Sequence, residues 1–344
     1  MKSSRFICAL SFLSIISVAF SGCDFKPKAI GNDNELAILV DADVREAAEG
    51  HLLAAFCPIV DTPQPEHRFI PVWGDFEAIS RLQTYRFILL VGTLDGKDKL
   101  SGLVQQMLSD EIIAGVRRGD YFVFQKKSEW ARDQLLLILV AENRQQLIAR
   151  LENDGQDLYQ LFVDERNQVI HDQLFHSYEQ KSIAAEIQEN YGIKLRIPHD
   201  YMIVREEPEE GWLRLKRTPP TRWLTLWRSE ILESDPVDSS WALATWSEMA
   251  DKFADPVRLN SDYLHFEAVT MKGLNGLTLS GLWETVGPQG GGPFFCHFLY
   301  NPAEKRVYML EGEVYNPGAD KEPYLKQLEV IVATFIPAGE QTGY

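Results

Sequence analysis

The stretch WLRLKRTPPTRWLTLWRS, residues 212–229, decides the fold class of the second half of the chain. Apolar and polar residues alternate on both sides of the turn TPPT, a pattern that predicts two half-buried strands in a hairpin. Further short strands are predicted at close spacing, over residues 193–197, 201–206, 265–271, 278–285, 294–300 and 306–315. Strands this short and this close together favour a mainly antiparallel sheet.

Three helices are predicted beside this sheet. They are Ile183 to Tyr191, which Gly192 ends, a helix capped by Ser239 or Ser240 that runs to Phe253, and Lys321 to Phe335. The second unit is therefore predicted to be α+β, with helices flanking the sheet. In the order of its elements it resembles the PsbP/Mog1 sandwich, an analogy of fold that implies no function.

The first half also mixes strands and helices. Strands are predicted at 35–41, 68–72, 85–94, 121–126 and 134–141, and helices at 44–56, 103–116 and 143–174, with Gly155 as a site for a kink. We read one sheet with helices packed on a face. The whole chain is thus predicted to be α+β, with one unit at residues 35–180, a second at 181–337, and a tail at 338–344.

The chain begins with a segment typical of a secretory leader. Lys2 and Arg5 form a basic head, and an uncharged run follows from Phe6 to Phe20. A bilayer span needs about 20 apolar residues, so this run is too short for one. We therefore predict that residues 1–22 are a signal peptide that takes no part in the fold.

The leader ends at Ser21-Gly22-Cys23, which resembles the lipobox of bacterial lipoproteins, with Phe20 where leucine is more usual. Each buried methylene of an attached acyl chain such as palmitate contributes about 0.8 kcal/mol, so two or three chains on Cys23 would make a lasting anchor. We predict lipidation of Cys23 and a tether over residues 23–34 that holds the body at the cell envelope, facing the periplasm or the cell exterior. The alternative is an ordinary secretory signal with a chance cysteine, and the choice of inner or outer membrane is open.

The predicted mature chain is strongly acidic, with 32 basic against 50 acidic residues and a formal charge of −18. Binding to nucleic acid and flat adsorption on anionic lipid both require positive charge, so this composition argues against them. We expect membrane contact through the N-terminal lipid alone and no nucleic-acid partner.

Two other cysteines of the mature chain, Cys57 and Cys296, stand far apart in the sequence. An extracytoplasmic compartment permits a disulfide between them. The bond requires Cα atoms within about 7 Å of one another. The interpretation we favour is that each cysteine is buried separately as a small apolar residue.

Two segments of the second unit are candidates for ligand binding. Gly290, Gly291 and Gly292 would let a backbone approach a ligand closely, although the segment lacks the features of a phosphate loop. Trp223 and Trp283 come from a region rich in tryptophan and arginine, residues favoured at recognition surfaces. The structural alternatives are a tight hairpin for the glycines and core packing for the tryptophans.

The sequence contains no spacing typical of a catalytic or metal site. Its seven histidines are scattered, and there is no HExxH, paired CxxC, EF-hand or GxSxG pattern. Glu66 and His67 are adjacent in TPQPEHRF, but neighbours along an extended chain point to opposite sides. We predict no catalytic residue, metal or cofactor, and we interpret residues 62–69 as a rigid connector rather than a partner-docking loop.

Several stretches together resemble a bacterial lipoprotein family known as domain of unknown function 4837. They are KAIGNDNELAILVD (28–41), TPQPE (62–66), YRFILLV (85–91), GLWE (281–284), GGPF (291–294) and MLEGEVYNPGADKEPYLKQLEVIVATF (309–335). The pattern departs at Glu322, where members more often have a basic residue after the lysine. The resemblance extends over nearly the whole mature chain; it implies a lipoprotein and brings no activity or site.

Three functions follow as hypotheses. The first is a non-catalytic, membrane-anchored module of the cell envelope that binds a partner protein or assists assembly. The second is a lipoprotein that binds a small molecule or glycan near the three glycines and Trp223 or Trp283. The third is an envelope hydrolase whose residues come from distant segments, which requires a nucleophile, a histidine and a carboxylate within hydrogen-bond reach.

Overall fold

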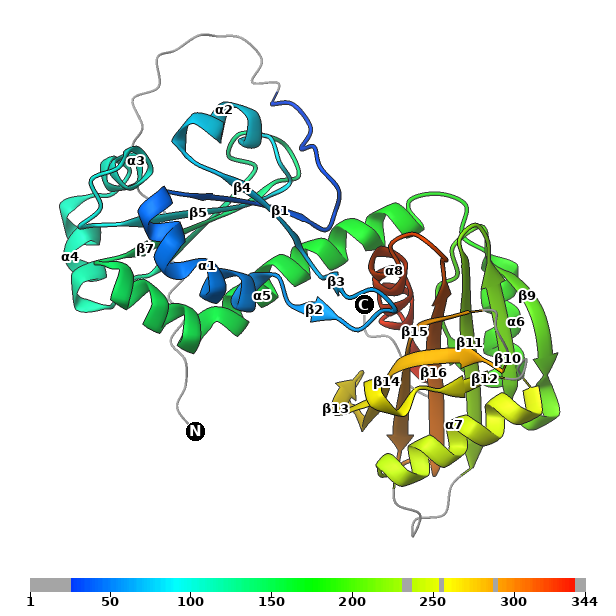
Figure 1. Cartoon of the computed structure of the whole chain (residues 1–344). Coiled ribbons are helices and arrows are strands. Elements are labelled where there is room, and N and C mark those ends of the chain that lie inside the picture. Colours follow the sequence, from blue (N-terminus) through cyan, green and yellow to red (C-terminus); the bar gives the residue numbers. More distant parts are fainter. Residues whose placement is uncertain (1–25, 231–236, 254–256, 287–289, 338–344) are drawn as a thin grey trace. The chain divides into compact units, whose positions relative to one another are not determined.

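A computed structural model describes residues 26–230, 237–253, 257–286 and 290–337 (Figure 1). The chain divides into two compact units. Unit 1 comprises Met1–Phe56 and Pro71–Tyr159, and unit 2 comprises Cys57–Ile70 and Gln160–Tyr344. The predicted leader, Cys23 and the tail at 338–344 lie outside the described residues. Within the described part, none of the helices has the length and apolarity needed to cross a bilayer.

The boundary between the units differs from the one predicted between residues 180 and 181. It falls inside α5, Arg144–Phe175, and Cys57–Ile70 is counted in unit 2. The sequence shows one apolar stripe along this helix but not which core each end joins. Ile170, Leu174 and Phe175 belong to the core of unit 2, so the second half of α5 is part of that unit.

Unit 1 is built on a five-stranded sheet with the strand order β4-β1-β5-β7-β6. The strands are β1 Glu35–Val40, β4 Ile70–Gly74, β5 Phe87–Thr93, β6 Val123–Lys127 and β7 Leu135–Ala141. β1, β5 and β7 run parallel, and β6 is antiparallel to β7. Every residue of β5 and β7 is buried, as expected of parallel strands covered on both faces rather than on the single face predicted.

The helices of unit 1 are α1 Ala42–Phe56, α2 Ile79–Leu82, α3 Lys99–Gln106, α4 Asp110–Arg118 and the first half of α5. The prediction of one helix over 103–116 was wrong, because the chain breaks between α3 and α4, where the Ser109 hydroxyl accepts a hydrogen bond from the Ile112 amide. Gly155 does not end α5. A Cβ at Gly155 would lie 3.0 Å from the Ala55 Cβ, so the glycine lets α5 pack closely against α1.

Unit 2 is built on an eight-stranded sheet with the order β12-β14-β15-β16-β11-β10-β9, and β13 pairs with β14. Its strands are β9 Met202–Glu207, β10 Trp212–Arg217, β11 Thr221–Glu230, β12 Val257–Leu259, β13 His265–Met271, β14 Leu274–Thr285, β15 Gly291–Asn301 and β16 Arg306–Tyr315. All the pairings are antiparallel. The α+β class and the hairpin at residues 212–229 are confirmed.

Several details of unit 2 differ from the prediction. The predicted strand 193–197 is only β8, Ile193–Lys194, which pairs with β17, Ile336–Pro337. The segment Cys57–Ile70 contains its own small hairpin of β2, Ile59–Val60, and β3, Glu66–His67. α7 begins after Asp238, whose side chain accepts the Trp241 amide, so Asp238 and neither serine is the cap.

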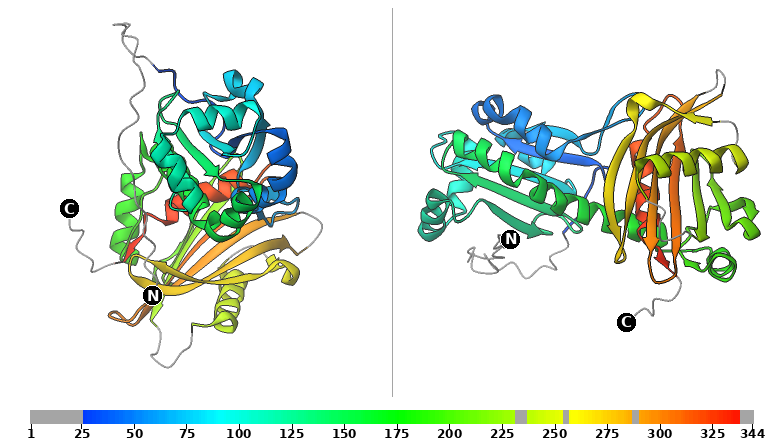
Figure 2. Two further views of the ribbon diagram at one scale, coloured as in Figure 1. Left: turned by 90° about the vertical axis from the view of Figure 1, so that its left-hand side faces the viewer. Right: turned by 90° about the horizontal axis from the view of Figure 1, so that it is seen from below.

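Helices cover both faces of the sheet of unit 2 (Figure 2), and each face carries a hydrophobic core. α8, Glu322–Val332, α6, Lys181–Tyr191, and the end of α5 cover one face, which we call the α8 side. α7, Ser239–Phe253, covers the other, the α7 side. Side chains alternate between them along each strand: on β11, Leu224 and Leu226 join the α8 side, and Trp227 joins the α7 side.

The two cysteines are free and buried, so a disulfide between them is the wrong interpretation. Cys296 belongs to the α7-side core, whereas the segment that begins at Cys57 packs on the α8-side core through Val60. Burial raises the pKa of the Cys57 thiol to about 12 and that of Cys296 well above its ordinary value. Both thiols are therefore inert, apolar fillers.

Candidate functional site

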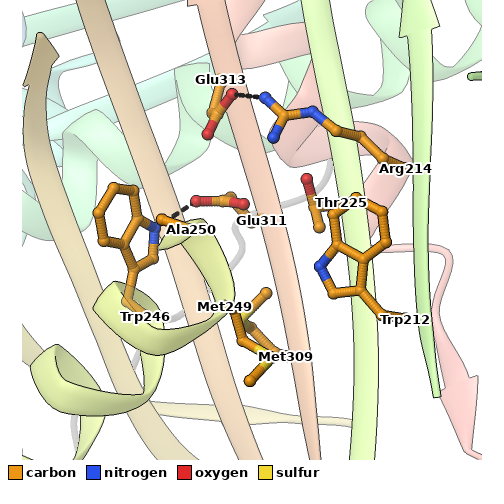
Figure 3. Close-up of a pocket in the computed structure, with 9 residues that line it drawn as sticks. All are labelled: Trp212, Arg214, Thr225, Trp246, Met249, Ala250, Met309, Glu311 and Glu313. Atoms are coloured by element: carbon orange, nitrogen blue, oxygen red, sulfur yellow. Dashed lines mark hydrogen bonds and ion pairs between the residues drawn. The ribbon is translucent and has the colours of Figure 1, made fainter. Parts of the chain in front are cut away.

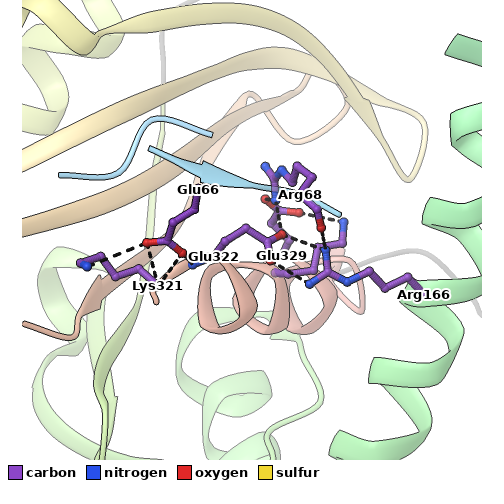
Figure 4. Close-up of polar contacts among 7 residues, drawn as sticks. Glu66, Arg68, Arg166, Lys321, Glu322 and Glu329 are labelled. Carbon is purple, nitrogen blue, oxygen red and sulfur yellow. Dashed lines mark hydrogen bonds and ion pairs between the residues drawn. The ribbon is translucent and has the colours of Figure 1, made fainter. Parts of the chain in front are cut away.

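A buried ion pair organises the α8 side of unit 2 (Figure 4). Arg166 of α5 donates from both terminal nitrogens to the two carboxylate oxygens of Glu322, each at 2.8 Å. Both side chains are only 1% exposed. Arg166 also donates to the Arg68 carbonyl at 2.8 Å. One guanidinium thus joins α5, α8 and the segment Cys57–Ile70.

Glu66 makes the second link between that segment and α8. Its carboxylate accepts hydrogen bonds from the backbone amides of Lys321 and Glu322, with closest distances of 2.8 Å. A carboxylate at this place satisfies unpaired amides and complements the positive end of the helix dipole. His67 turns the other way and bonds the Cys57 carbonyl at 2.7 Å, so the two neighbours do not form an acid–base pair.

A groove of about 530 Å³ lies between the elements that these contacts hold together. Its lining residues are Asp164, Asn167, Gln168 and His171 of α5, Lys326, Glu329 and Val330 of α8, Ala333 and Thr334 just after it, Arg196 after β8, and Lys272. Lys272 and Gly273 form the β13–β14 turn, with φ of 48° and 74°. Such a two-residue turn needs positive φ at both positions, and it sets Lys272 at the rim of the groove.

Most of the charged groups in the groove are held by partners. Arg196 pairs with both oxygens of Glu179, at 3.0 and 2.5 Å, and donates to His171 Nε2 at 2.7 Å. Arg68 and Lys326 hold Glu329 at 2.8 and 2.9 Å. Burial alone would raise the pKa of Glu329, but these two cations lower it to about 2. Lys272 is exposed and pairs with no described carboxylate.

The α7 side holds a second polar cluster, beneath α7 (Figure 3). Glu311 and Glu313 project from β16 toward α7. Trp246 donates its indole N–H to Glu311, and Arg214 of β10 pairs with Glu313. The cavity among these side chains is only about 10 Å³, room for about one water molecule.

Glu311 is the unusual group of this cluster. Burial raises its pKa, the like charge of Glu313 raises it further, and it reaches about 8 despite Arg214 and the Trp246 hydrogen bond. Burial and the neighbouring carboxylate of Glu313 therefore favour the neutral form of Glu311. Among the described residues, no group of three or more His, Cys, Asp or Glu side chains is placed to hold a metal ion.

The structure brings the predicted ligand-binding residues together. The rings of Trp223 and Trp283 meet edge to face, with centroids 5.9 Å apart. Gly291 and Gly292 are the first residues of β15 and pair with Glu284 and Trp283, while Gly290 has a φ of 123° beside the Tyr315 ring. Trp283 is only 5% exposed, and Arg214 and Lys216 lie over the ring of Trp223. The cluster is aromatic packing with little free ring surface.

Sequence reasoning missed the groove and the Arg166–Glu322 pair. The residues that line the groove are spread from Asp164 to Thr334, and no local spacing connects them. The sequence did contain one indication of the buried pair, because Arg166 is a charged residue on the otherwise apolar stripe of α5. The departure of Glu322 from the family pattern was a second signal, since the structure makes it the partner of Arg166.

The comparisons with known proteins bear on unit 2. Residues 180–334 match the model of the family described as "Domain of unknown function (DUF4837)". The resemblance found in the sequence is therefore confirmed over this part of the chain. A search of curated proteins found no match.

Three solved structures with a similar fold each match between 42% and 44% of this chain. The Ran-binding protein Mog1p of Saccharomyces cerevisiae is 12% identical over 43% of this chain and 92% of its own, with a TM-score of 0.32. LpqN, described as involved in cell envelope biogenesis of Mycobacterium tuberculosis, is 15% identical over 42% and 83%, with a TM-score of 0.28. A Bacteroides thetaiotaomicron protein is 11% identical over 44% and 47%, with a TM-score of 0.26.

The raised pKa of Glu311 predicts a pH-dependent stability. In the unfolded chain Glu311 ionises near 4.5, and in the folded chain only near 8. Unit 2 should therefore lose stability as pH rises between these values, by up to about 1.4 kcal/mol per pH unit. Glu311→Gln keeps an acceptor for Trp246 and should match the wild type near pH 5 but exceed its stability at pH 8.

Denaturant unfolding followed by tryptophan fluorescence measures this effect, because six of the eight tryptophans lie in unit 2. Glu267→Gln, at an exposed position on β13, is the matched control and should leave the pH dependence unchanged. If the stability difference between Glu311→Gln and wild type stays constant from pH 5 to 8, Glu311 does not have the raised pKa described above.

Proposed function

We propose that this protein is a lipid-anchored, non-catalytic binding protein of the bacterial cell envelope, and that its groove receives a polar segment of a partner protein. The groove, with its volume of about 530 Å³, is the observation that carries the proposal. The groove offers a partner a place to bind, and the contacts of Arg166 and Glu66 hold its walls.

The lining of the groove favours a protein segment over a small molecule. Small-molecule pockets are predominantly apolar, with a few polar groups that fix orientation. Here Val330 and Ala333 are the only apolar lining residues, and the other nine are polar or charged. A polar, open surface of this kind is typical of the rim of a protein–protein interface.

Charge supports the same choice. The groove contains Arg196, Lys272 and Lys326 against Asp164 and Glu329, a small positive excess on a chain whose net charge is −16. The amine of Lys272, which has no partner among the described residues, is the group most available to a ligand. A partner segment with an acidic residue would pair with it.

The anchor predicts where the protein is found. The full-length protein should fractionate with membranes and carry acyl mass on Cys23, since two or three chains bind a bilayer lastingly. Cys23→Ser should move it to the soluble fraction or leave an unprocessed precursor. Mass spectrometry of the N-terminal peptide and membrane fractionation measure both effects. An unmodified Cys23 on a processed chain contradicts the anchor.

The groove predicts a site-specific contact in the cell. A photo-crosslinking amino acid at Gln168 or Ala333, both exposed in the groove, should give a discrete crosslinked species in the native host. Adding Lys272→Glu should reduce that species severalfold, because it replaces the free amine by a carboxylate.

The crosslinking experiment has an internal control. The same amino acid at Glu189, exposed on α6 and outside the groove, should give no such species. Equal crosslinking from Glu189 and Gln168, or crosslinking that Lys272→Glu leaves unchanged, would place the partner elsewhere and refute the groove as its site.

A further inference from the structure

Arg222 is a buried cation with no counter-ion. Its side chain projects from β11 to the α8 side, and the residue is 2% exposed. Its Nε and Nη1 atoms are buried and make no hydrogen bond within the described part of the chain. This differs from Arg166, equally buried, which binds a carboxylate with both terminal nitrogens.

The charged neighbour of Arg222 is another cation. Arg217 is its cross-strand partner at the end of the β10–β11 hairpin, and burial and Arg217 both lower the pKa of Arg222. Asp200 does not neutralise it, because that carboxylate pairs with Arg217 at 2.5 Å and with His199 at 2.7 Å. No described carboxylate forms an ion pair with Arg222.

Two tyrosines complete the surroundings. The Tyr324 ring of α8 lies 4.9 Å from the guanidinium carbon of Arg222. The Tyr201 side chain is fully buried beside the guanidinium, and its hydroxyl also makes no hydrogen bond to a described residue. The guanidinium of Arg222 can only donate, whereas the Tyr201 hydroxyl beside it can donate or accept. A neutral hydroxyl does not balance the positive charge, so the cluster lacks an anion.

We propose that Arg222 and Tyr201 bind a small oxyanion, a carboxylate or phosphate group, which enters beside Arg217. A buried cation without a counter-ion is strongly destabilising, and an oxyanion would supply both the negative charge and the acceptor oxygens for the unbonded Nε and Nη1 of Arg222. Arg217, the cross-strand partner of Arg222, and Asp200 are 21% and 33% exposed, so partly exposed polar side chains lie next to the buried guanidinium. The amides at the start of α8 are already bonded to Glu66, so the site depends on side chains.

This site is separate from the groove, since neither Arg222 nor Tyr201 lines it. The two proposals therefore stand or fall independently. The proposed ligand carries either a phosphate or a carboxylate group. Inorganic phosphate is the probe for the first kind of ligand, and acetate is the probe for the second.

The test is thermal unfolding of the full-length protein in neutral detergent, titrated with sodium phosphate or sodium acetate against sodium chloride at equal ionic strength. The wild type should show a saturable rise in Tm with one of the two oxyanions. The oxyanion that raises Tm shows whether the natural ligand carries a phosphate or a carboxylate group. Tyr201→Phe keeps the ring and should weaken the apparent affinity by about tenfold, since one hydrogen bond to an anion is lost. Arg222→Met should abolish the response and raise Tm in its absence.

Arg258→Met, at an exposed position on β12, is the matched arginine control and should respond as the wild type does. If Arg222→Met fails to fold, Tyr201→Phe decides the question. A wild type whose Tm follows ionic strength alone, or a Tyr201→Phe variant with unchanged affinity, overturns the proposal.

Discussion

The buried pair of Arg166 and Glu322 is the constraint on which the rest of unit 2 depends. Removing two charges from water is costly, and the cost is recovered only when every hydrogen-bonding group finds a partner. Here the guanidinium is fixed by a two-point contact to Glu322 and by the Arg68 carbonyl. These contacts determine how the end of α5 and the segment Cys57–Ile70 lie against α8, and the groove is the space left between the elements so fixed.

The two faces of the unit 2 sheet then differ in their chemistry. On the α7 side, Glu311 bonds Trp246 and Glu313 pairs with Arg214 around a cavity the size of one water molecule, which leaves no room for a ligand. On the α8 side, the groove has a small excess of positive groups, and the amine of Lys272 is exposed in it without a partner among the described residues. A groove of this kind on an acidic protein is suited to bind a partner segment with an acidic residue, which is the function we propose.

Much of the fold could be predicted from the sequence, because its determinants are local. Alternation along residues 212–229 specified β10 and β11, and Gly192, with a φ of 63°, ended α6 as expected. The errors have a common cause in non-local contacts. The second half of α5 joins a core that its own periodicity cannot reveal. The separate burial of Cys57 and Cys296, which we favoured from the sequence, agrees with the structure. The same holds for the site: Trp223 and Trp283 could be identified from composition, whereas the groove is assembled from segments up to 170 residues apart, from Asp164 to Thr334.

The central claim is that the Arg166–Glu322 ion pair holds α5, α8 and the segment Cys57–Ile70 together. Hydrogen–deuterium exchange of the full-length protein, with and without Arg166→Met, tests this claim most directly. The substitution leaves Glu322 buried without its main partner, so we predict that amides of α8 and of residues 57–70 lose protection together. Arg118→Met, exposed in unit 1, should change neither segment. Faster exchange confined to α5 around residue 166, with α8 and residues 57–70 unchanged, would contradict the account.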